Sequence, residues 1–335
     1  MDADLVLEGG GVKGIGLVGA ISVLEERGYR LHRVAGTSAG AIVGALVAAG
    51  MRASELIEVM NAVDYTRFQD ATALSHLGLP GEALSVLFDK GAFKGDYLVE
   101  WLGHHLESAG VSTFADLRDP DPASALPLEQ RYRLVAMTSD ISEGRLRRLP
   151  WDYAAYGLDP ARVKVVDAVR ASMSIPFFYR PVKLRHADGR ESWLVDGGML
   201  SNFPVDVFDR PTGERPRWPT FGIKLSARPD ATLGVAHAIH GPVSYAQAML
   251  GTMTGFHDQM HLDDPSVLAR TMFVDSMKVK ATDFDLGPAE RDRLFENGRT
   301  AATAFLDGAD GAPAWDFDAY VARYRRAPAP SLHPA

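Results

Sequence analysis

The sequence predicts an α/β fold in which a central, mostly parallel sheet lies between layers of helices, a three-layer α/β/α sandwich. Three observations lead to this prediction. Short apolar segments of strand length recur along the chain, segments with apolar residues at helical spacing follow them, and glycine-containing turns separate the two kinds of segment. Alternation of strands and helices is typical of parallel sheets covered by helices.

The first fifty residues contain two strand–turn–helix units. Residues 5–7 indicate the first strand, and the helix after it is expected to end at Gly28, because glycine commonly terminates helices. Residues 33–35 indicate the second strand. The helix expected over 39–49 is apolar on all sides, so we expect it to be buried.

The later part of the chain continues the same alternation. Further elements are expected as strands at 134–137, 193–195, 221–225 and 272–274 and as helices at 163–173 and 288–306. We expect one domain over residues 1–310, followed by an extension over 311–335 whose Pro/Ala-rich end is disordered.

The composition excludes several classes of protein. The net charge of −8 disfavours a nucleic-acid partner, because phosphate contacts require a basic surface. The absence of cysteine excludes a thiol nucleophile, a disulfide framework and a thiolate metal site. The N-terminus lacks the pattern of a signal peptide, and no apolar run is long enough to span a bilayer, so we expect a cytoplasmic protein.

A serine lies in the turn between the second strand and the buried helix. The turn reads Gly36-Thr37-Ser38-Ala39-Gly40 and matches the nucleophile elbow, which exposes a serine hydroxyl at a sharp bend. Small residues at Gly36 and Gly40 suit such a bend, because the strand and helix backbones crowd each other there. The alternative is a Gly/Ser turn without chemistry. Ser38 is therefore a candidate nucleophile.

A glycine-rich turn follows the first strand and occupies the equivalent position. Because adjacent parallel strands end at the same sheet edge, the backbone amides of Gly9-Gly10-Gly11 would face Ser38 and suit an oxyanion hole. The spacing Gly9, Gly11 and Gly14 also matches the dinucleotide-binding fingerprint, but the second strand ends without the acidic residue that binds the ribose. A tight packing turn is the third interpretation.

Four blocks together resemble the patatin-like phospholipases. In chain order they are Gly9-Gly10-Gly11-Val12-Lys13-Gly14, Gly36-Thr37-Ser38-Ala39-Gly40, Ala171-Ser172-Met173-Ser174-Ile175-Pro176, and Asp196-Gly197-Gly198 followed by Asn202-Phe203-Pro204. They span most of residues 5–204, and their joint occurrence in this order is specific. The stretch after about Ser226 carries no motif of this kind.

The resemblance implies hydrolysis of fatty-acyl esters of phospholipids or related lipids by a Ser–Asp dyad through an acyl-enzyme. It places Ser38 as the nucleophile and Asp196 as the general base. Lys13 falls where the family carries Arg or Lys, and it steadies the loop, contacts a headgroup or is merely solvated. No cofactor or metal is implied, and the partner is a lipid at a membrane or micelle surface. The oxyanion hole would be formed by the amides of Gly9, Gly10, Gly11 and Val12.

Other patterns leave alternatives open. His257 and His261 are spaced like two zinc ligands on a helix, but the motif has Asp where a metalloprotease carries Glu. A Ser–Asp–His triad would draw its histidine from those that follow Asp196, which include His237 and His240. A non-catalytic nucleotide- or lipid-binding module is the alternative from another class. Residues 64–94 suit either a cap over an acyl channel or a pair of packed helices.

Overall fold

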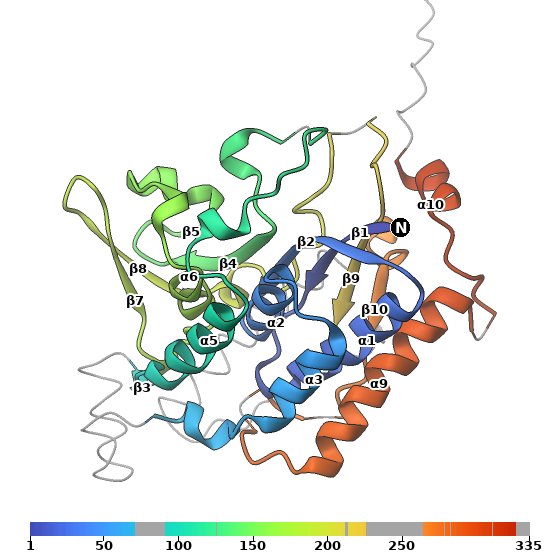
Figure 1. Ribbon diagram of the computed structural model, residues 1–335, viewed down its shortest axis with the longest axis horizontal. Coiled ribbons are helices and arrows are strands. Elements are labelled where there is room, and N and C mark those ends of the chain that lie inside the picture. Colours follow the sequence, from blue (N-terminus) through green and yellow to red (C-terminus); the bar gives the residue numbers. More distant parts are fainter. Residues whose placement is uncertain are drawn as a thin grey trace, which may run out of the picture.

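A sheet of eight strands forms the centre of the molecule (Figure 1). This computed structural model describes residues 1–70, 91–124, 126–211, 214–225, 264–277, 279–281, 283–309 and 311–325. The strands pair in the order β10-β9-β1-β2-β4-β8-β7, with β5 paired to β4. Their bounds are β1 Asp2–Leu7, β2 Arg30–Thr37, β4 Leu134–Asp140, β5 Arg145–Leu149, β7 Val182–Arg185, β8 Glu191–Asp196, β9 Thr220–Lys224 and β10 Thr271–Phe273. A separate pair consists of β3 Gly91–Phe93 and β6 Phe177–Tyr179.

Most pairs in the central sheet are parallel. The strands β10, β9, β1, β2 and β4 run in one direction, whereas β5 and β8 are antiparallel to β4 and β7 is antiparallel to β8. In the register between β1 and β2, Leu7 pairs with Gly36. The two turns that follow these strands therefore lie next to each other at one sheet edge, as the sequence predicts.

The helices α1, α2 and α3 cover one face of the sheet in Figure 1. The bounds of the described helices are α1 Ile15–Glu26, α2 Ala39–Ala48, α3 Ala53–Ala62, α5 Asp96–Ser108, α6 Val165–Ser172, α8 Pro265–Leu268, α9 Pro288–Asp307 and α10 Phe317–Tyr324. The helix α2 packs directly on the sheet, and all its residues except Ile42 are buried. Among the described helices, none combines the length and apolar character that a bilayer crossing requires.

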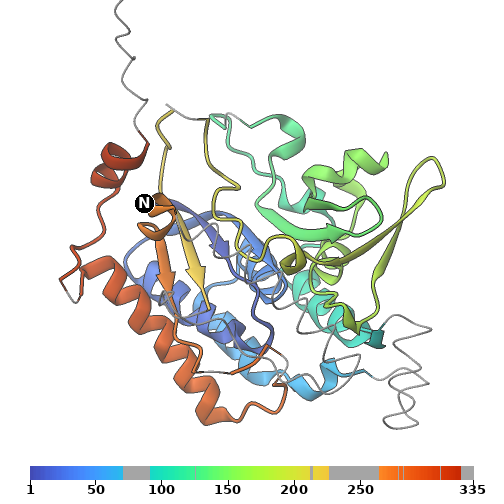
Figure 2. The same ribbon diagram turned by 180° about the vertical axis from the view of Figure 1, so that it is seen from behind.

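The opposite face of the sheet is covered in part by the segment that follows β8. Figure 2 shows this side, with β9 in yellow and β10 in orange. The ring of Phe203 lies against Gly222 of β9, on the face away from α1, and the Lys224 side chain lies 5.5 Å from the centre of that ring. Phe203 and Val205 are fully buried there, so the sheet is apolar on both faces.

The fold prediction is confirmed as an α/β sandwich with a mostly parallel central sheet. The expected strands and helices all occur within a few residues of their predicted bounds. The part of the predicted extension that the structure describes contains α10. Trp315 before this helix packs edge-on against Phe221 of β9, at 5.5 Å between ring centres, and Arg325 after it pairs with Asp209 at 3.1 Å. The predicted disordered end falls largely on residues 326–335, outside the described residues.

Candidate active site

Ser38 lies at the sharp bend between β2 and α2. Its backbone has φ 52° and ψ −121°, a conformation that non-glycine residues rarely adopt and that is often found at functional sites. Steric crowding explains why the residues two positions before and after Ser38 are glycines. A Cβ on Gly36 would overlap the Gly40 carbonyl, and a Cβ on Gly40 would overlap the Leu7 carbonyl of β1. The bend is therefore possible only with glycine on both sides of the serine.

The last residue of α6, Ser172, and the residues just after it support the bend. The Ser38 N–H donates a hydrogen bond of 3.0 Å to the hydroxyl of Ser172, which is fully buried. Two residues later, the carbonyl of Ser174 accepts a hydrogen bond of 2.9 Å from the Asp196 N–H. One short segment thus holds the backbones of both proposed dyad residues. In the sequence, only the family resemblance points to this block, because no local pattern predicts the hydrogen bonds that it makes.

Asp196 ends β8, and its side chain caps the 3-10 turn Gly197–Met199. One carboxylate oxygen accepts a 2.8 Å hydrogen bond from the Gly198 N–H, whereas Oδ2 is buried and has no hydrogen-bond partner among the described residues. Burial raises the pKa of Asp196 to about 6, although the Gly198 N–H and the nearby Ser38 hydroxyl both favour the charged form. The Ser38 hydroxyl is near enough to the carboxylate to contribute to this pKa, and long distances between a nucleophile and its base are frequent in unliganded sites.

The raised pKa of Asp196 predicts the pH dependence of catalysis. A carboxylate must be deprotonated to accept a proton, so kcat/KM for a soluble ester should rise as the pH increases through about 6 and be constant above it. Initial rates from pH 4.5 to 9 at constant ionic strength measure this. An acidic limb centred near pH 4, the range of an unperturbed Asp, would contradict the role given to the buried carboxyl.

The glycine turn is packed between two parts of the chain. A Cβ on Gly10 would overlap the Leu225 side chain, and Gly11, at φ +56°, lies directly against the carbonyl of Ala281. That carbonyl also accepts a hydrogen bond of 3.1 Å from the Val12 N–H. Among the described residues, none accepts a hydrogen bond from the Gly10 or Gly11 amide. The free donors of this turn are therefore those two amides, whereas the Val12 amide is occupied.

A side chain in the glycine turn should impair catalysis if its amides stabilise the oxyanion. We expect Gly10→Val to displace the turn from Leu225 and to lower kcat about 10²–10³-fold, the usual effect of losing one oxyanion donor. Gly103→Val on α5 is the matched control, because a Cβ there meets open space. Wild-type turnover by Gly10→Val, measured with a soluble ester, would show that the turn is only structural.

Lys13 lies beneath the same turn, with much of its side chain buried. Its ammonium group donates to the Leu225 carbonyl at 3.3 Å, and burial lowers its pKa, while the nearby Glu8 carboxylate opposes that shift. This contact favours loop support over a headgroup contact among the roles considered for Lys13.

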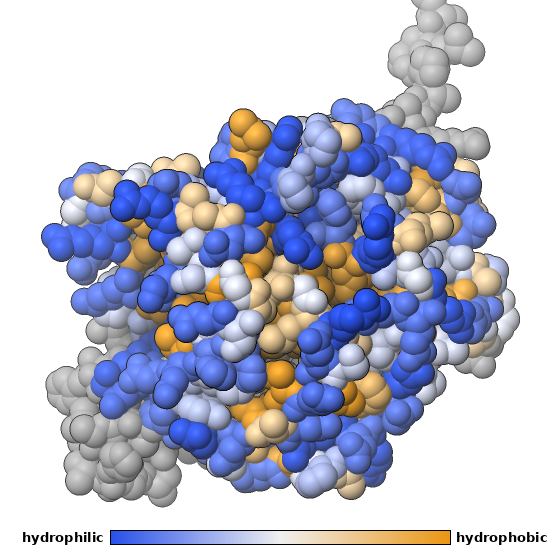
Figure 3. Space-filling model, in the orientation of Figure 1, coloured by the Kyte–Doolittle hydropathy of each residue, from blue (hydrophilic) through white to orange (hydrophobic). Residues whose placement is uncertain are grey.

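Ser38 opens into an apolar pocket of about 560 Å³, part of which is open to solvent. Side chains from α2, α3 and α5 line it together with those that follow α3 and α6. They include Ile42, Met60, Phe68, Leu98, Trp101 and Tyr179. Figure 3 shows apolar residues in the middle of the face that carries these helices, surrounded by hydrophilic ones. Tyr65 and Phe68 come from the segment 64–94, which suits either a cap or a pair of packed helices, and residues 71–90 of that segment lie outside the described residues.

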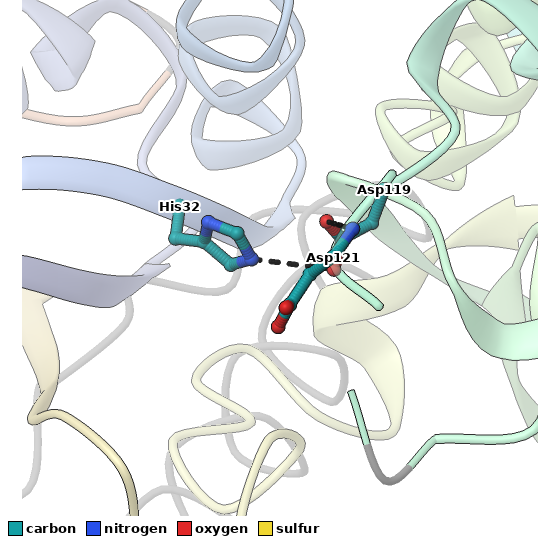
Figure 4. A group of neighbouring side chains, drawn as sticks. All are labelled: His32, Asp119 and Asp121. Carbon is teal, nitrogen blue, oxygen red and sulfur yellow. Dashed lines mark hydrogen bonds and ion pairs between the residues drawn. The ribbon is translucent and has the colours of Figure 1, made fainter. Parts of the chain in front are cut away.

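A group of potential metal ligands lies at the opposite edge of the sheet, near the start of β2 (Figure 4). Ligand atoms of His32, Asp119 and Asp121 lie within 4.8 Å of one another. Each carboxylate already has a partner, because His32 contacts Asp119 at 3.3 Å and Arg217 pairs with Asp121. These contacts account for the group as polar side chains that already have partners within the protein. The histidines of the alternative zinc site, His257 and His261, lie outside the described residues, as do His237 and His240.

Comparison with known proteins identifies a matching family and several relatives. The family model described as patatin-like phospholipase matches residues 5–209. The chain is 36% identical to "Uncharacterized protein YqhO" of Bacillus subtilis over 313 residues, which are 91% of this chain and 98% of that protein. It is 26% identical to the "Uncharacterized NTE family protein Rv1063c" of Mycobacterium tuberculosis, a match that covers 60% of this chain and 44% of the relative.

Among solved structures, VipD from Legionella pneumophila has a similar fold. The TM-score is 0.50 at 19% sequence identity, and the match covers 90% of this chain and 66% of VipD. The similarity concerns the fold alone. The four motif blocks all lie within the residues that the family model matches, and residues of the first three line one pocket. This chain belongs to the patatin-like phospholipase family of lipid hydrolases.

Proposed function

We propose that this protein hydrolyses fatty-acyl esters of phospholipids or related lipids, with Ser38 as the nucleophile and Asp196 as its base. The observation that carries the proposal is the position of Ser38, whose strained bend places it beside a buried carboxyl and at the opening of an apolar pocket. Serine alone is a weak nucleophile and requires a neighbouring base. The apolar lining suits an aliphatic acyl chain better than a nucleotide, whose phosphates and ribose need polar partners.

The reaction proceeds in two steps. The Asp196 carboxylate accepts the hydroxyl proton while Ser38 Oγ attacks the ester carbonyl carbon, and the amides of Gly10 and Gly11 stabilise the resulting oxyanion. Asp196 then donates its proton to the departing alcohol, which leaves an acyl-enzyme. In the second step Asp196 accepts a proton from water, the hydroxide attacks the acyl-enzyme, and the fatty acid leaves as Ser38 regains its proton. We propose that the lipid is met transiently at a membrane or micelle surface.

A fluorophosphonate probe tests the proposal, because only an activated serine reacts with it. We expect the wild-type protein to be labelled at Ser38, as identified by mass spectrometry of the modified peptide. Ser22→Ala is the matched control and should be labelled like the wild type, because the Ser22 hydroxyl donates to the Gly19 carbonyl on α1 and lies outside the pocket. Absence of labelling, or labelling at another serine, would contradict the proposed role of Ser38.

The proposed chemistry requires no cation. We therefore expect EDTA to leave the turnover of a soluble ester unchanged within about twofold, since none of the steps involves a Lewis acid. The control is the same assay with EDTA and an excess of zinc. Loss of activity with EDTA and its return with zinc would favour the alternative zinc hydrolase built on His257 and His261.

A further inference from the structure

The glycine turn and the Asp196 turn meet at one half-buried side chain, that of Asn202. The Asn202 backbone carbonyl accepts a hydrogen bond of 3.3 Å from the Gly9 N–H. Its side-chain NH₂ group donates to the Gly9 carbonyl at 3.3 Å and to the Glu8 carboxylate at 3.4 Å. Three bonds from one residue thus fix the beginning of the glycine turn.

The side-chain oxygen of Asn202 fills the space between the two turns. A Cβ on Gly9 would overlap this oxygen, and a Cβ on Gly198 would lie 2.9 Å from it, closer than normal contact. Gly198 is the residue whose N–H bonds to the Asp196 carboxylate. Asn202 therefore contacts the turn that presents the oxyanion donors and the turn that holds the base.

Glu8 extends this network to the next strand of the sheet. Its carboxylate pairs with the ammonium group of Lys224, at the end of β9, and accepts a hydrogen bond from the Leu225 N–H. Glu8 and Lys224 are 4% and 3% exposed, so the pair is removed from solvent. The carboxylate is fixed by β9, which gives the Asn202 amide a rigid partner.

We propose that Asn202 is a positioning residue that sets the distance between the glycine turn and the Asp196 turn. The inference rests on the proposed function, because it assigns the oxyanion donors to that turn. Such donors act only when they are held within about 0.5 Å of the productive geometry. Without the side-chain bonds of Asn202, the protein would still bind an ester, but the turn would stabilise the transition state less well. We therefore expect kcat to fall and KM to stay the same.

The test compares two substitutions. Asn202→Leu keeps the branched shape and the number of heavy atoms but is bulkier and has no polar side-chain atoms, and Asn202→Ala, which only removes atoms, serves if the leucine variant does not fold. We expect either to lower kcat for p-nitrophenyl butyrate about 10–100-fold, less than the loss of a donor, with KM within about twofold. Thr271→Val is the matched control, because it removes one buried side-chain bond, of 2.7 Å to the Val267 carbonyl, at the far edge of the sheet. Wild-type kcat in Asn202→Leu would overturn the inference.

A second readout does not depend on ester hydrolysis. Hydrogen–deuterium exchange in the peptide spanning residues 8–14 should be faster in Asn202→Leu than in the wild type and unchanged in Thr271→Val. Unchanged exchange in the Asn202 variant would overturn the positioning role even if kcat fell. If the wild-type protein neither reacts with a fluorophosphonate nor hydrolyses esters, the proposed function fails, while the exchange experiment still decides whether Asn202 holds the turn.

Discussion

Ser38→Ala is expected to lower ester hydrolysis by at least about 10³-fold, because the substitution removes the only atom of this residue that attacks the substrate. The fold should persist. The N–H bond to Ser172 does not involve the lost hydroxyl, and alanine needs no more space at the bend than serine. Turnover of p-nitrophenyl butyrate and of a phospholipid in mixed micelles, together with the melting temperature, measures both effects. Full activity in a folded variant would end the assignment of Ser38.

Asp196→Asn is expected to reduce turnover about 10²–10⁴-fold, because an amide cannot accept the serine proton. The same loss should not follow from Ala substitution at any histidine after Asp196, and each of those variants should keep most of the wild-type turnover. This comparison separates a dyad from a triad. A single folded histidine variant whose loss matches that of Ser38→Ala would identify a triad and show that Asp196 is not the base. The positions to test are His237, His240, His257, His261 and His333.

The same substitution should stabilise the protein above pH 6. Burial raises the pKa of Asp196 from 3.8 to about 6, so the folded state binds a proton more tightly than the unfolded state does. Folding stability therefore falls as the pH rises from about 4 to about 6, and the full cost, of order 3 kcal/mol, remains above that range. Asparagine does not titrate. Thermal melts should thus show a higher melting temperature for Asp196→Asn than for the wild type at pH 7.5, and a smaller difference at pH 4.

The parts of the site that sequence analysis located are those formed by local patterns. Each proposed reactive group lies at the end of a strand with a clear apolar signal: Ser38 directly follows β2, and Asp196 is the last residue of β8. Adjacent parallel strands then bring the glycine turn and the serine turn to one edge. The antiparallel direction of β8 was not predictable in this way, because the apolar pattern of a strand is the same in both directions.

Contacts between distant segments account for what the sequence did not reveal. The hydroxyl of Ser172 and the amide of Asn202 are ordinary polar groups until the fold brings them against the two turns. The pocket draws its walls from α3, α5 and the residues after α6, which share no common motif. The hydrogen bond between Val12 and the Ala281 carbonyl joins residues far apart in the chain, and neither position carries a local signal for it.

The contact between Ala281 and the glycine turn has a consequence for how this family can diversify. The family match ends at residue 209, yet Ala281 and Phe284 form part of the pocket wall, and β9 anchors the Glu8 carboxylate. A truncated chain ending at residue 209 would keep every motif block and lose one wall of the apolar pocket. Conversely, chimeras that exchange only residues 264–309 between relatives would replace Ala281 and Phe284 of the pocket wall and leave the four motif blocks unchanged. Selection can thus change the pocket wall through a part of the gene that carries none of the motif blocks.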